Sequence, residues 1–189
     1  MYSKKEIYTS SNLLSFLRLL MAVPFWILIG NLNEPDIRYT VAGLAILAAI
    51  TDVLDGYLAR KFYQVTELGK IIDPLADKIV IAAIVIRLFT IGEIPDYYFY
   101  MIIGRDLLIF TGGIFVTKKI GRVLPSNMLG KIAMLVISFV MLLIFFNVNR
   151  DTLLFEVFYY SSIILIFASL FAYLYRAAEY IKKENNGTV

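Results

Sequence analysis

The stretch DVLDGYLAR, residues 52–60, places two carboxylates and an arginine at the end of a long apolar run. The chain around it is 60% hydrophobic and has a mean hydropathy of +0.76. Soluble domains have an apolar share of only about 45–50%. Because charge is costly inside a bilayer, ionisable residues within such a chain mark functional sites. The stretch therefore indicates a membrane protein and also the position of its site.

Six segments of the chain are long and apolar enough to cross a bilayer, which takes about 20 residues. Turn residues and charges separate them, for example at Gly92-Glu93-Ile94-Pro95-Asp96. We therefore predict an all-α integral membrane protein, a six-transmembrane-helix bundle, with residues 1–189 as a single domain. The predicted spans are 12–31, 38–58, 72–91, 97–117, 128–147 and 153–175.

Lys and Arg are distributed unevenly between the two sides that these spans define. Only Arg38 and Arg150 fall on one side, whereas twelve basic residues fall on the other: Lys4, Lys5, Arg60, Lys61, Lys70, Lys118, Lys119, Arg122, Lys131, Arg176, Lys182 and Lys183. Because basic loops stay inside, both termini are expected to be cytoplasmic, with the protein in the plasma (inner) membrane. The basic residues are spread over several loops, which argues against nucleic-acid binding.

Four aspartates flank the connection between the second and third predicted spans. Asp52 and Asp55 are spaced i,i+3, and Asp73 and Asp77 are spaced i,i+4, so each pair shares one helix face. The short connection makes the two spans neighbours, so the two faces can converge at their cytoplasmic ends. The alternative is that these aspartates are charged helix ends facing water. That would explain one pair, but it is a poor explanation for four aspartates interleaved with small residues.

Four converging carboxylates repel one another unless they take up protons or bind a cation. All-oxygen ligands select hard cations such as Mg²⁺, Mn²⁺ or Ca²⁺. Four aspartates can hold two such ions, an arrangement suited to displacement at phosphorus. The chain has no Cys and no His, which excludes thiolate and imidazole chemistry and leaves a carboxylate as the available base.

The complete pattern Asp52-x2-Asp55-Gly56-x2-Ala59-Arg60-x8-Gly69-x3-Asp73-x3-Asp77 resembles the signature of the CDP-alcohol phosphatidyltransferases. The resemblance implies a six-helix membrane enzyme, a homodimer, that moves a phosphatidyl group from CDP-diacylglycerol to an alcohol and releases CMP. It also implies two divalent cations, Mg²⁺ or Mn²⁺, held by the four aspartates, with Asp77 as the general base. Positions that hold the CDP portion match Asp52, Gly56, Ala59, Arg60 and Gly69.

A second polar pattern lies at the start of the first predicted span. Asn12, Ser15 and Arg18 recur every three residues, similar to a Pro-Asn-x2-Thr-x2-Arg pattern in the glycerophosphate branch of the family. Helix capping by Asn12 and snorkelling of Arg18 are the alternative. We predict that Asn12 and Ser15 contact CDP and that Arg18 faces a phosphate.

The acceptor pocket is predicted from basic residues in the second half of the chain. Arg105, Arg122 and Lys131, together with Arg18, suit a phosphate on the acceptor. Arg105 lies deep in its span, where burial of a guanidinium requires an anion. Asp106 projects about 100° away round a helix; it is expected either to neutralise Arg105 or to line the pocket rim.

Two branches of the family, which use different acceptors, are candidates for this chain. The chain is similar to phosphatidylglycerophosphate synthases over nearly its whole length, so glycerol 3-phosphate is preferred. Arg105-Asp106, however, is similar to the CMP-forming cardiolipin synthases, whose acceptor is phosphatidylglycerol. Gly112-Gly113 could open room for such a lipid, although small residues also pack helices. Inositol-phosphate and serine acceptors are less favoured.

A small cation carrier is the alternative from another functional class. The four aspartates would then form a cation pathway, and polar residues would be expected along a path to the outer face. The outer halves of the spans are almost purely apolar. Arg87 is the exception, and it is expected to snorkel toward the outer surface. The carrier is therefore disfavoured.

Overall fold

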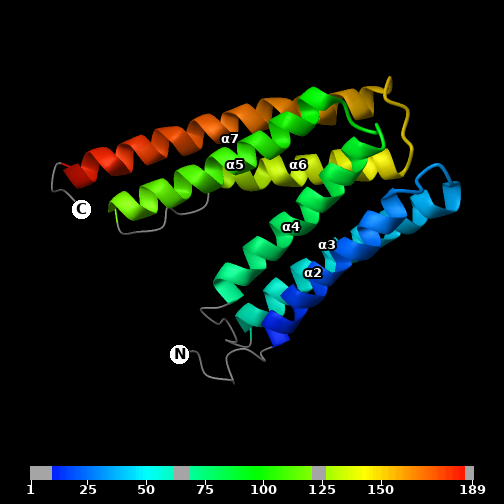
Figure 1. The fold of residues 1–189 in the computed structure, drawn as a ribbon, viewed down its shortest axis with the longest axis horizontal. Helices are drawn as coiled ribbons and strands as arrows, with labels where there is room; N and C mark the ends of the chain where they lie inside the picture. Colours follow the sequence, from blue (N-terminus) through cyan, green and yellow to red (C-terminus); the bar gives the residue numbers. More distant parts are fainter. Residues whose placement is uncertain (1–9, 62–68, 121–126, 186–189) are drawn as a thin grey trace. The chain divides into compact units, whose positions relative to one another are not determined.

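The computed structural model describes the backbone of residues 10–61, 69–120 and 127–185. Within these ranges it describes side chains except at 10–16, 18, 52, 54–61, 69–77, 119–120 and 183–185. The described residues form six α-helices and no strand, which confirms the predicted class (Figure 1). The helices are α2 (Ser10–Ile29), α3 (Pro35–Lys61), α4 (Gly69–Thr90), α5 (Asp96–Ile120), α6 (Met128–Phe145) and α7 (Leu153–Asn185).

Three of the helices contain described segments that are long and apolar enough to cross a membrane. These segments are Asp96–Lys118, Met128–Phe145 and Leu153–Lys182, and α2 carries a shorter apolar stretch at Leu19–Ile29. A helix rises about 1.5 Å per residue, so 18 or more residues approach the thickness of the hydrocarbon core. The chain is an all-helical membrane protein.

The turn signals of the sequence end the helices as expected. Gly92 has φ of 77° after α4, and the Glu93 N–H donates to the Leu88 carbonyl at 2.9 Å. Asn147 has φ of 53° after α6, and the Val148 N–H donates to the Leu143 carbonyl at 3.0 Å. Both ends have the left-handed residue and the 6→1 hydrogen bond of a Schellman motif, which satisfies carbonyls at the helix terminus.

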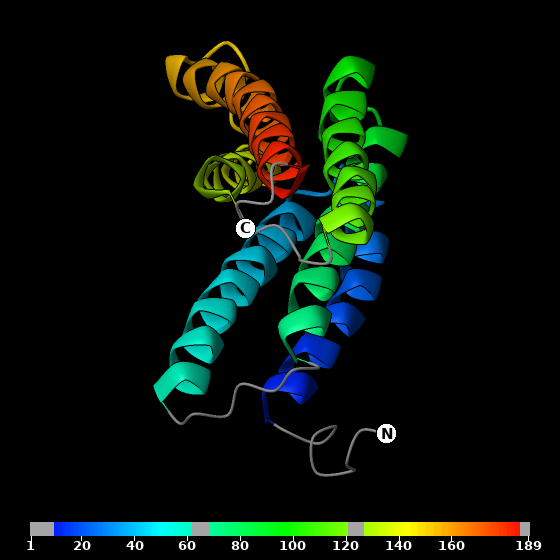
Figure 2. The same ribbon diagram turned by 90° about the vertical axis from the view of Figure 1, so that its left-hand side faces the viewer.

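The chain divides into two compact units, Met1–Glu93 with Phe145–Asn147, and Ile94–Ile144 with Val148–Val189. In the first unit, α2 packs extensively against α4 and to a smaller extent against α3. Figure 2 shows the start of α2, the end of α3 and the start of α4 at the same end of this unit. The single domain expected over residues 1–189 stays a prediction.

Arg87 joins α4 to α2 at the opposite end of the first unit. Its Nε donates to the Trp26 carbonyl at 3.1 Å, and its guanidinium lies 5.3 Å from the centroid of the Trp26 ring. Trp26 belongs to the last turn of α2, whose carbonyls lack partners within the helix and favour a nearby cation. Arg87 therefore joins two helices at this end, and the snorkelling expected for it stays a prediction.

Gly30 provides the room that this contact needs. A Cβ added there would lie 3.0 Å from Arg87 Cζ and still closer to Nη2. We expect Gly30→Ala to displace the guanidinium at the flexible end of Arg87 and to destabilise the protein by about 0.5–1.5 kcal/mol, the net value of the lost hydrogen bond. Thermal unfolding in detergent measures this, with Gly43→Ala as the control.

Gly43 is exposed in α3, and an added Cβ meets nothing within 4 Å. Its replacement by alanine should leave the thermal midpoint unchanged or raise it, because glycine weakens a helix interior. Equal midpoints for the two variants would contradict the proposed Arg87 contact.

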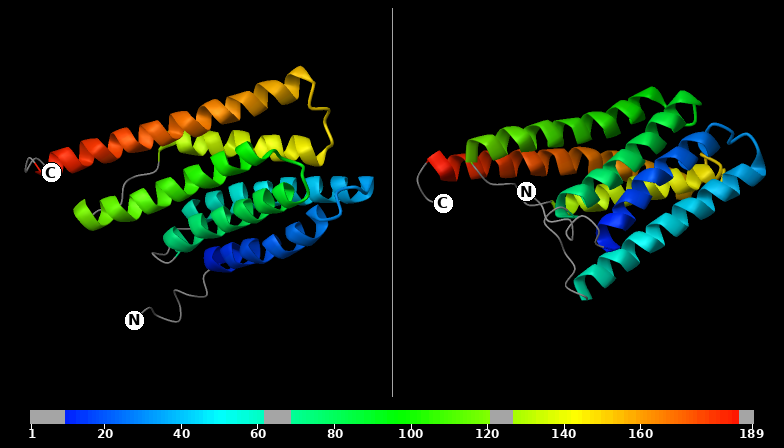
Figure 3. Two further views of the ribbon diagram at one scale, coloured as in Figure 1. Left: turned by 45° about the horizontal axis from the view of Figure 1, so that its top comes forward. Right: turned by 60° about the horizontal axis from the view of Figure 1, so that its bottom comes forward.

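In the second unit, α5 packs along α7 (Figure 3). Residues at seven-residue spacing form this interface, including Tyr98 and Arg105 on α5 and Ser162 and Ser169 on α7, all of them buried. The end of α5, the start of α6 and the end of α7 point to the same side of the unit, with α6 starting short of the other two ends (Figure 3). Exposed Lys118, Lys131 and Lys182 mark this side as the basic end of the unit.

Candidate active site

The four aspartate positions lie on helices, as predicted. Asp52 and Asp55 are in the last turns of α3, and Asp73 and Asp77 are in the first turns of α4. Both helix segments belong to the end of the first unit that Figure 2 shows together with the start of α2. The aspartate side chains lie outside the described part of the chain, so their convergence on a metal stays a prediction.

The remaining residues predicted to bind CDP lie on the same three helix segments. Gly56, Ala59 and Arg60 follow Asp55 on α3, and Gly69 begins α4. Asn12, Ser15 and Arg18 lie on α2, the helix that contacts both of the others. Their side chains also lie outside the described part, but their helices bring the backbone positions to one end of the unit.

The residues fit divalent cations by the chemistry of their donors. The four positions supply only carboxylate oxygens, the ligands that Mg²⁺ and Mn²⁺ prefer, and their helical spacing puts each pair on one face. Among the described side chains, no group of three acidic residues could hold a metal ion elsewhere. Members of the family generally depend on a divalent metal.

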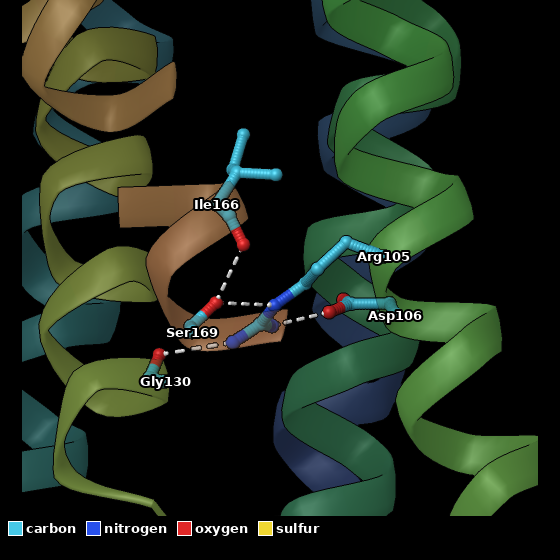
Figure 4. Close-up of polar contacts among 5 residues, drawn as sticks. All are labelled: Arg105, Asp106, Gly130, Ile166 and Ser169. Carbon is cyan, nitrogen blue, oxygen red and sulfur yellow. Dashed lines mark hydrogen bonds and ion pairs between the residues drawn. The ribbon is translucent and has the colours of Figure 1, made fainter. Parts of the chain in front are cut away.

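Arg105 is the one buried cation among the described side chains of the second unit, with 7% of its surface exposed. Figure 4 shows its side chain reaching from α5 toward α6 and α7. Its Nε donates to Ser169 Oγ at 3.1 Å and its Nη2 donates to the Gly130 carbonyl at 3.4 Å. A Cβ on Gly130 would lie 3.0 Å from Nη2, so the glycine lets the guanidinium approach the α6 backbone.

Asp106 meets the Arg105 guanidinium directly, with 2.5 Å between Nη1 and Oδ1. The expectation that Asp106 points away was wrong, because the long arginine side chain brings its guanidinium round to the neighbouring carboxylate. Of the two roles expected for Asp106, neutralisation is the observed one. A substrate anion is therefore not required to compensate the charge of Arg105. Three of its five N–H groups have partners among the described residues.

The other residues predicted for the acceptor phosphate are less fully described. Lys131 is exposed near the start of α6. The Arg18 side chain and all of Arg122 lie outside the described residues. The structure therefore does not bring the four predicted cations together, and the acceptor pocket stays a prediction.

Gly112 and Gly113 are packed against an aromatic ring. A Cβ on Gly112 would lie 3.3 Å from Tyr173 Cε1, and one on Gly113 would lie 3.1 Å from the Tyr173 hydroxyl. Of the two explanations for these glycines, the structure therefore favours helix packing over open room for a lipid.

Ser169 and Tyr173 were missed by the sequence reasoning. A signal was present, because Ser162 and Ser169 recur at seven-residue spacing in an otherwise apolar segment. Such spacing puts both hydroxyls on one helix face, where each meets a polar residue of α5.

Comparisons with known proteins show the family of the chain. Residues 8–174 match the model of the CDP-alcohol phosphatidyltransferase family. The chain is 40% identical over 126 residues to a CDP-diacylglycerol–glycerol-3-phosphate 3-phosphatidyltransferase of Bacillus subtilis; the match covers 64% of this chain and 63% of that protein. A protein of the same name from Aquifex aeolicus is 35% identical over 179 residues, covering 92% of this chain and 98% of its own length.

A protein with a different activity in its name also matches. The cardiolipin synthase (CMP-forming)/mitochondrial hydrolase fusion protein of Schizosaccharomyces pombe is 36% identical over 116 residues, covering 61% of this chain and 19% of the fusion protein. These relatives differ in name, and the family model spans most of the chain. The chain belongs to the CDP-alcohol phosphatidyltransferase family.

Proposed function

We propose that the chain transfers the phosphatidyl group of CDP-diacylglycerol to glycerol 3-phosphate, giving phosphatidylglycerophosphate and CMP. The observation that carries this proposal is the placement of the complete Asp52–Asp77 pattern on α3 and α4, at the end of the unit where α2 begins. Relatives named for this activity support it.

The chain's own residues would divide the reaction between them. Asp77 takes the proton from the acceptor hydroxyl, whose oxygen then bonds to the phosphatidyl phosphorus. The bond from that phosphorus to CMP breaks, and CMP leaves with the electron pair. The four aspartates would hold two divalent cations, Mg²⁺ or Mn²⁺, which when bound neutralise the diphosphate oxygens. Asn12, Ser15, Gly56, Ala59, Arg60 and Gly69 would hold the CDP portion.

The proposed location follows from the distribution of charge. The basic residues favour a plasma (inner) membrane protein with both termini and the active site facing the cytoplasm. A site at this interface leaves the acyl chains of the donor in the bilayer and its nucleotide in water. The resemblance to the family supports a homodimer.

A CMP-forming cardiolipin synthase, with phosphatidylglycerol as acceptor, is the second candidate. Arg105-Asp106 and the match to the fission yeast protein favour it. The packing of Tyr173 against Gly112 and Gly113 disfavours it, because the space is occupied. Purified protein with Mg²⁺ and CDP-diacylglycerol should release CMP when glycerol 3-phosphate is added. Release only with phosphatidylglycerol would replace the first candidate with the second.

Arg105 is proposed to hold the acceptor phosphate through the N–H groups that its protein partners leave over, together with Arg18, Arg122 and Lys131. Removing such a charge-assisted contact costs roughly 1.5–3 kcal/mol. We expect Arg105→Ala to raise the KM for the acceptor about tenfold to hundredfold, and the KM for CDP-diacylglycerol much less. Steady-state kinetics with each substrate varied in turn measures this.

Arg87→Ala is the matched control, because it removes a guanidinium that also joins two helices but lies in the last turn of α4. It should lower the thermal midpoint and leave both KM values unchanged. A rise in the donor KM alone for Arg105→Ala would move Arg105 to the donor site.

A further inference from the structure

The interface between α5 and α7 contains three polar layers, and the third differs from the other two. In the first layer, the Tyr98 and Ser162 hydroxyls lie 2.7 Å apart, and in the second, Arg105 donates to Ser169. Both layers are buried, and their side chains have partners. The third layer contains Gly112, Gly113 and Tyr173, and here the polar group has no partner among the described residues.

The Tyr173 hydroxyl is buried although the residue as a whole is partly exposed. The two glycines admit its ring and surround one side of the hydroxyl with backbone. A buried hydroxyl without a hydrogen bond is costly. In a native protein, such a group calls for an explanation such as a missing water, ion or ligand.

Asn127 supplies a second buried donor of this kind. It caps α6, since its Oδ1 accepts a hydrogen bond from the Leu129 N–H at 3.1 Å. The capping bond fixes the amide orientation and leaves Nδ2 buried, without a partner among the described residues. Both orphaned groups can therefore donate to an oxygen atom.

Helix geometry puts these two donors on the same side of the Arg105 layer. Arg105 joins Gly130 of α6 to Ser169 of α7 (Figure 4). Asn127 precedes Gly130 by three residues, and Tyr173 follows Ser169 by four, which corresponds to about 4.5 Å and 6 Å along the helices. Because α6 starts and α7 ends at the basic end of the unit, both shifts lead toward that end.

We propose that Tyr173 Oη and Asn127 Nδ2 donate hydrogen bonds to phosphate oxygens of the acceptor substrate and thereby determine acceptor specificity. This inference rests on the proposed function, because it names further residues for the acceptor. The Tyr173 hydroxyl, the Asn127 amide and the N–H groups that the Arg105 partners leave over are all donors, and a phosphate group offers several acceptor oxygens. The phosphate belongs either to glycerol 3-phosphate or to the headgroup of phosphatidylglycerol.

Tyr173→Phe tests the proposal, with Tyr98→Phe as the matched control on the same interface. The purified full chain is assayed for CMP release with glycerol 3-phosphate and, separately, with phosphatidylglycerol. We expect Tyr173→Phe to raise the KM for the acceptor used about two- to tenfold, the effect of one neutral hydrogen bond. The KM for CDP-diacylglycerol should not change. Without substrates its thermal midpoint should be unchanged or higher, because the lost hydroxyl had no partner.

Tyr98→Phe should do the reverse. It removes the hydroxyl that pairs with Ser162, so the thermal midpoint should fall while both KM values stay the same. Asn127→Ser keeps an oxygen able to cap α6 and removes Nδ2, so it should raise the acceptor KM to a similar extent without lowering the midpoint.

An unchanged acceptor KM in Tyr173→Phe, or a midpoint lowered as far as in Tyr98→Phe, overturns the proposal. The wild-type chain distinguishes this failure from that of the proposed function. If the wild type releases CMP with glycerol 3-phosphate while Tyr173→Phe behaves identically, only the role of Tyr173 is lost. If the wild type releases CMP with neither acceptor, the proposed function fails, and this inference fails with it.

Discussion

Asp77→Asn is expected to lower the rate of CMP release about 10²- to 10⁴-fold, the range that general base catalysis contributes. Asparagine has nearly the same shape as aspartate but cannot take a proton from the acceptor hydroxyl. His and Cys are absent from the chain, so no imidazole or thiolate can replace the lost base. Binding of CDP should be largely retained. Single-turnover kinetics and calorimetric titration with CDP measure the two quantities separately.

Asp52→Asn is the comparison that separates a base from a ligand. It removes a carboxylate proposed to hold metal and nucleotide but not the proposed base, so CDP binding should weaken together with metal binding. If both variants lose CDP affinity equally, Asp77 is only a metal ligand and the proton acceptor lies elsewhere.

Removal of divalent metal is expected to abolish CMP release altogether. Four carboxylates at one end of a helical unit repel one another without a cation, and the diphosphate of the donor adds further negative charge. Excess EDTA should reduce CMP release to the background rate, and Mg²⁺ or Mn²⁺ should restore it. A sample without protein, treated in parallel, supplies the background. Full activity in excess EDTA would contradict the proposed two-metal site.

The helices and most of their ends could be predicted from the sequence, because length, hydropathy and turn residues are local properties. Gly92 and Asn147 end helices where the turn signals indicated. The last helix was predicted too short, at residue 175, because its apolar composition fades there. It continues to Asn185, and beyond residue 175 Ala177, Tyr180 and Ile181 pack with Val116 of α5.

The partners of buried cations could not be predicted in the same way. Arg87 contacts Trp26, which lies 61 positions away in the chain, and no local pattern indicates that pairing. Asp106 was placed away from Arg105 by helix rotation alone, which ignores the reach of a long side chain. The packing of Tyr173 against Gly112 and Gly113 likewise depends on the register between two helices.

The candidate site was predicted from residue spacing, and the structure describes the backbone positions of its aspartates but not their side chains. Asp52, Asp55, Asp73 and Asp77 lie on the helices expected, at one end of one unit. The expectation that the two aspartate-bearing spans pack as direct neighbours was wrong for the described residues: in the first unit α2 packs against both α3 and α4, whereas α3 and α4 do not pack substantially against each other. A short connection keeps two helices near in the chain but does not determine which helix packs between them. The packing of α2 places Asn12, Ser15 and Arg18 on the helix that the two aspartate-bearing helices share as a neighbour.

The proposed transfer of a phosphatidyl group to glycerol 3-phosphate can be measured as the incorporation of labelled glycerol 3-phosphate into lipid. Purified wild-type protein in detergent is given Mg²⁺, CDP-diacylglycerol and glycerol 3-phosphate labelled in its carbon skeleton, and labelled lipid and free CMP are both quantified. The proposed transfer requires that each CMP released matches one labelled lipid carrying a terminal phosphate, and Asp77→Asn should lower the rate of both about 10²- to 10⁴-fold. CMP release without labelled lipid, or no CMP release at all, would contradict it.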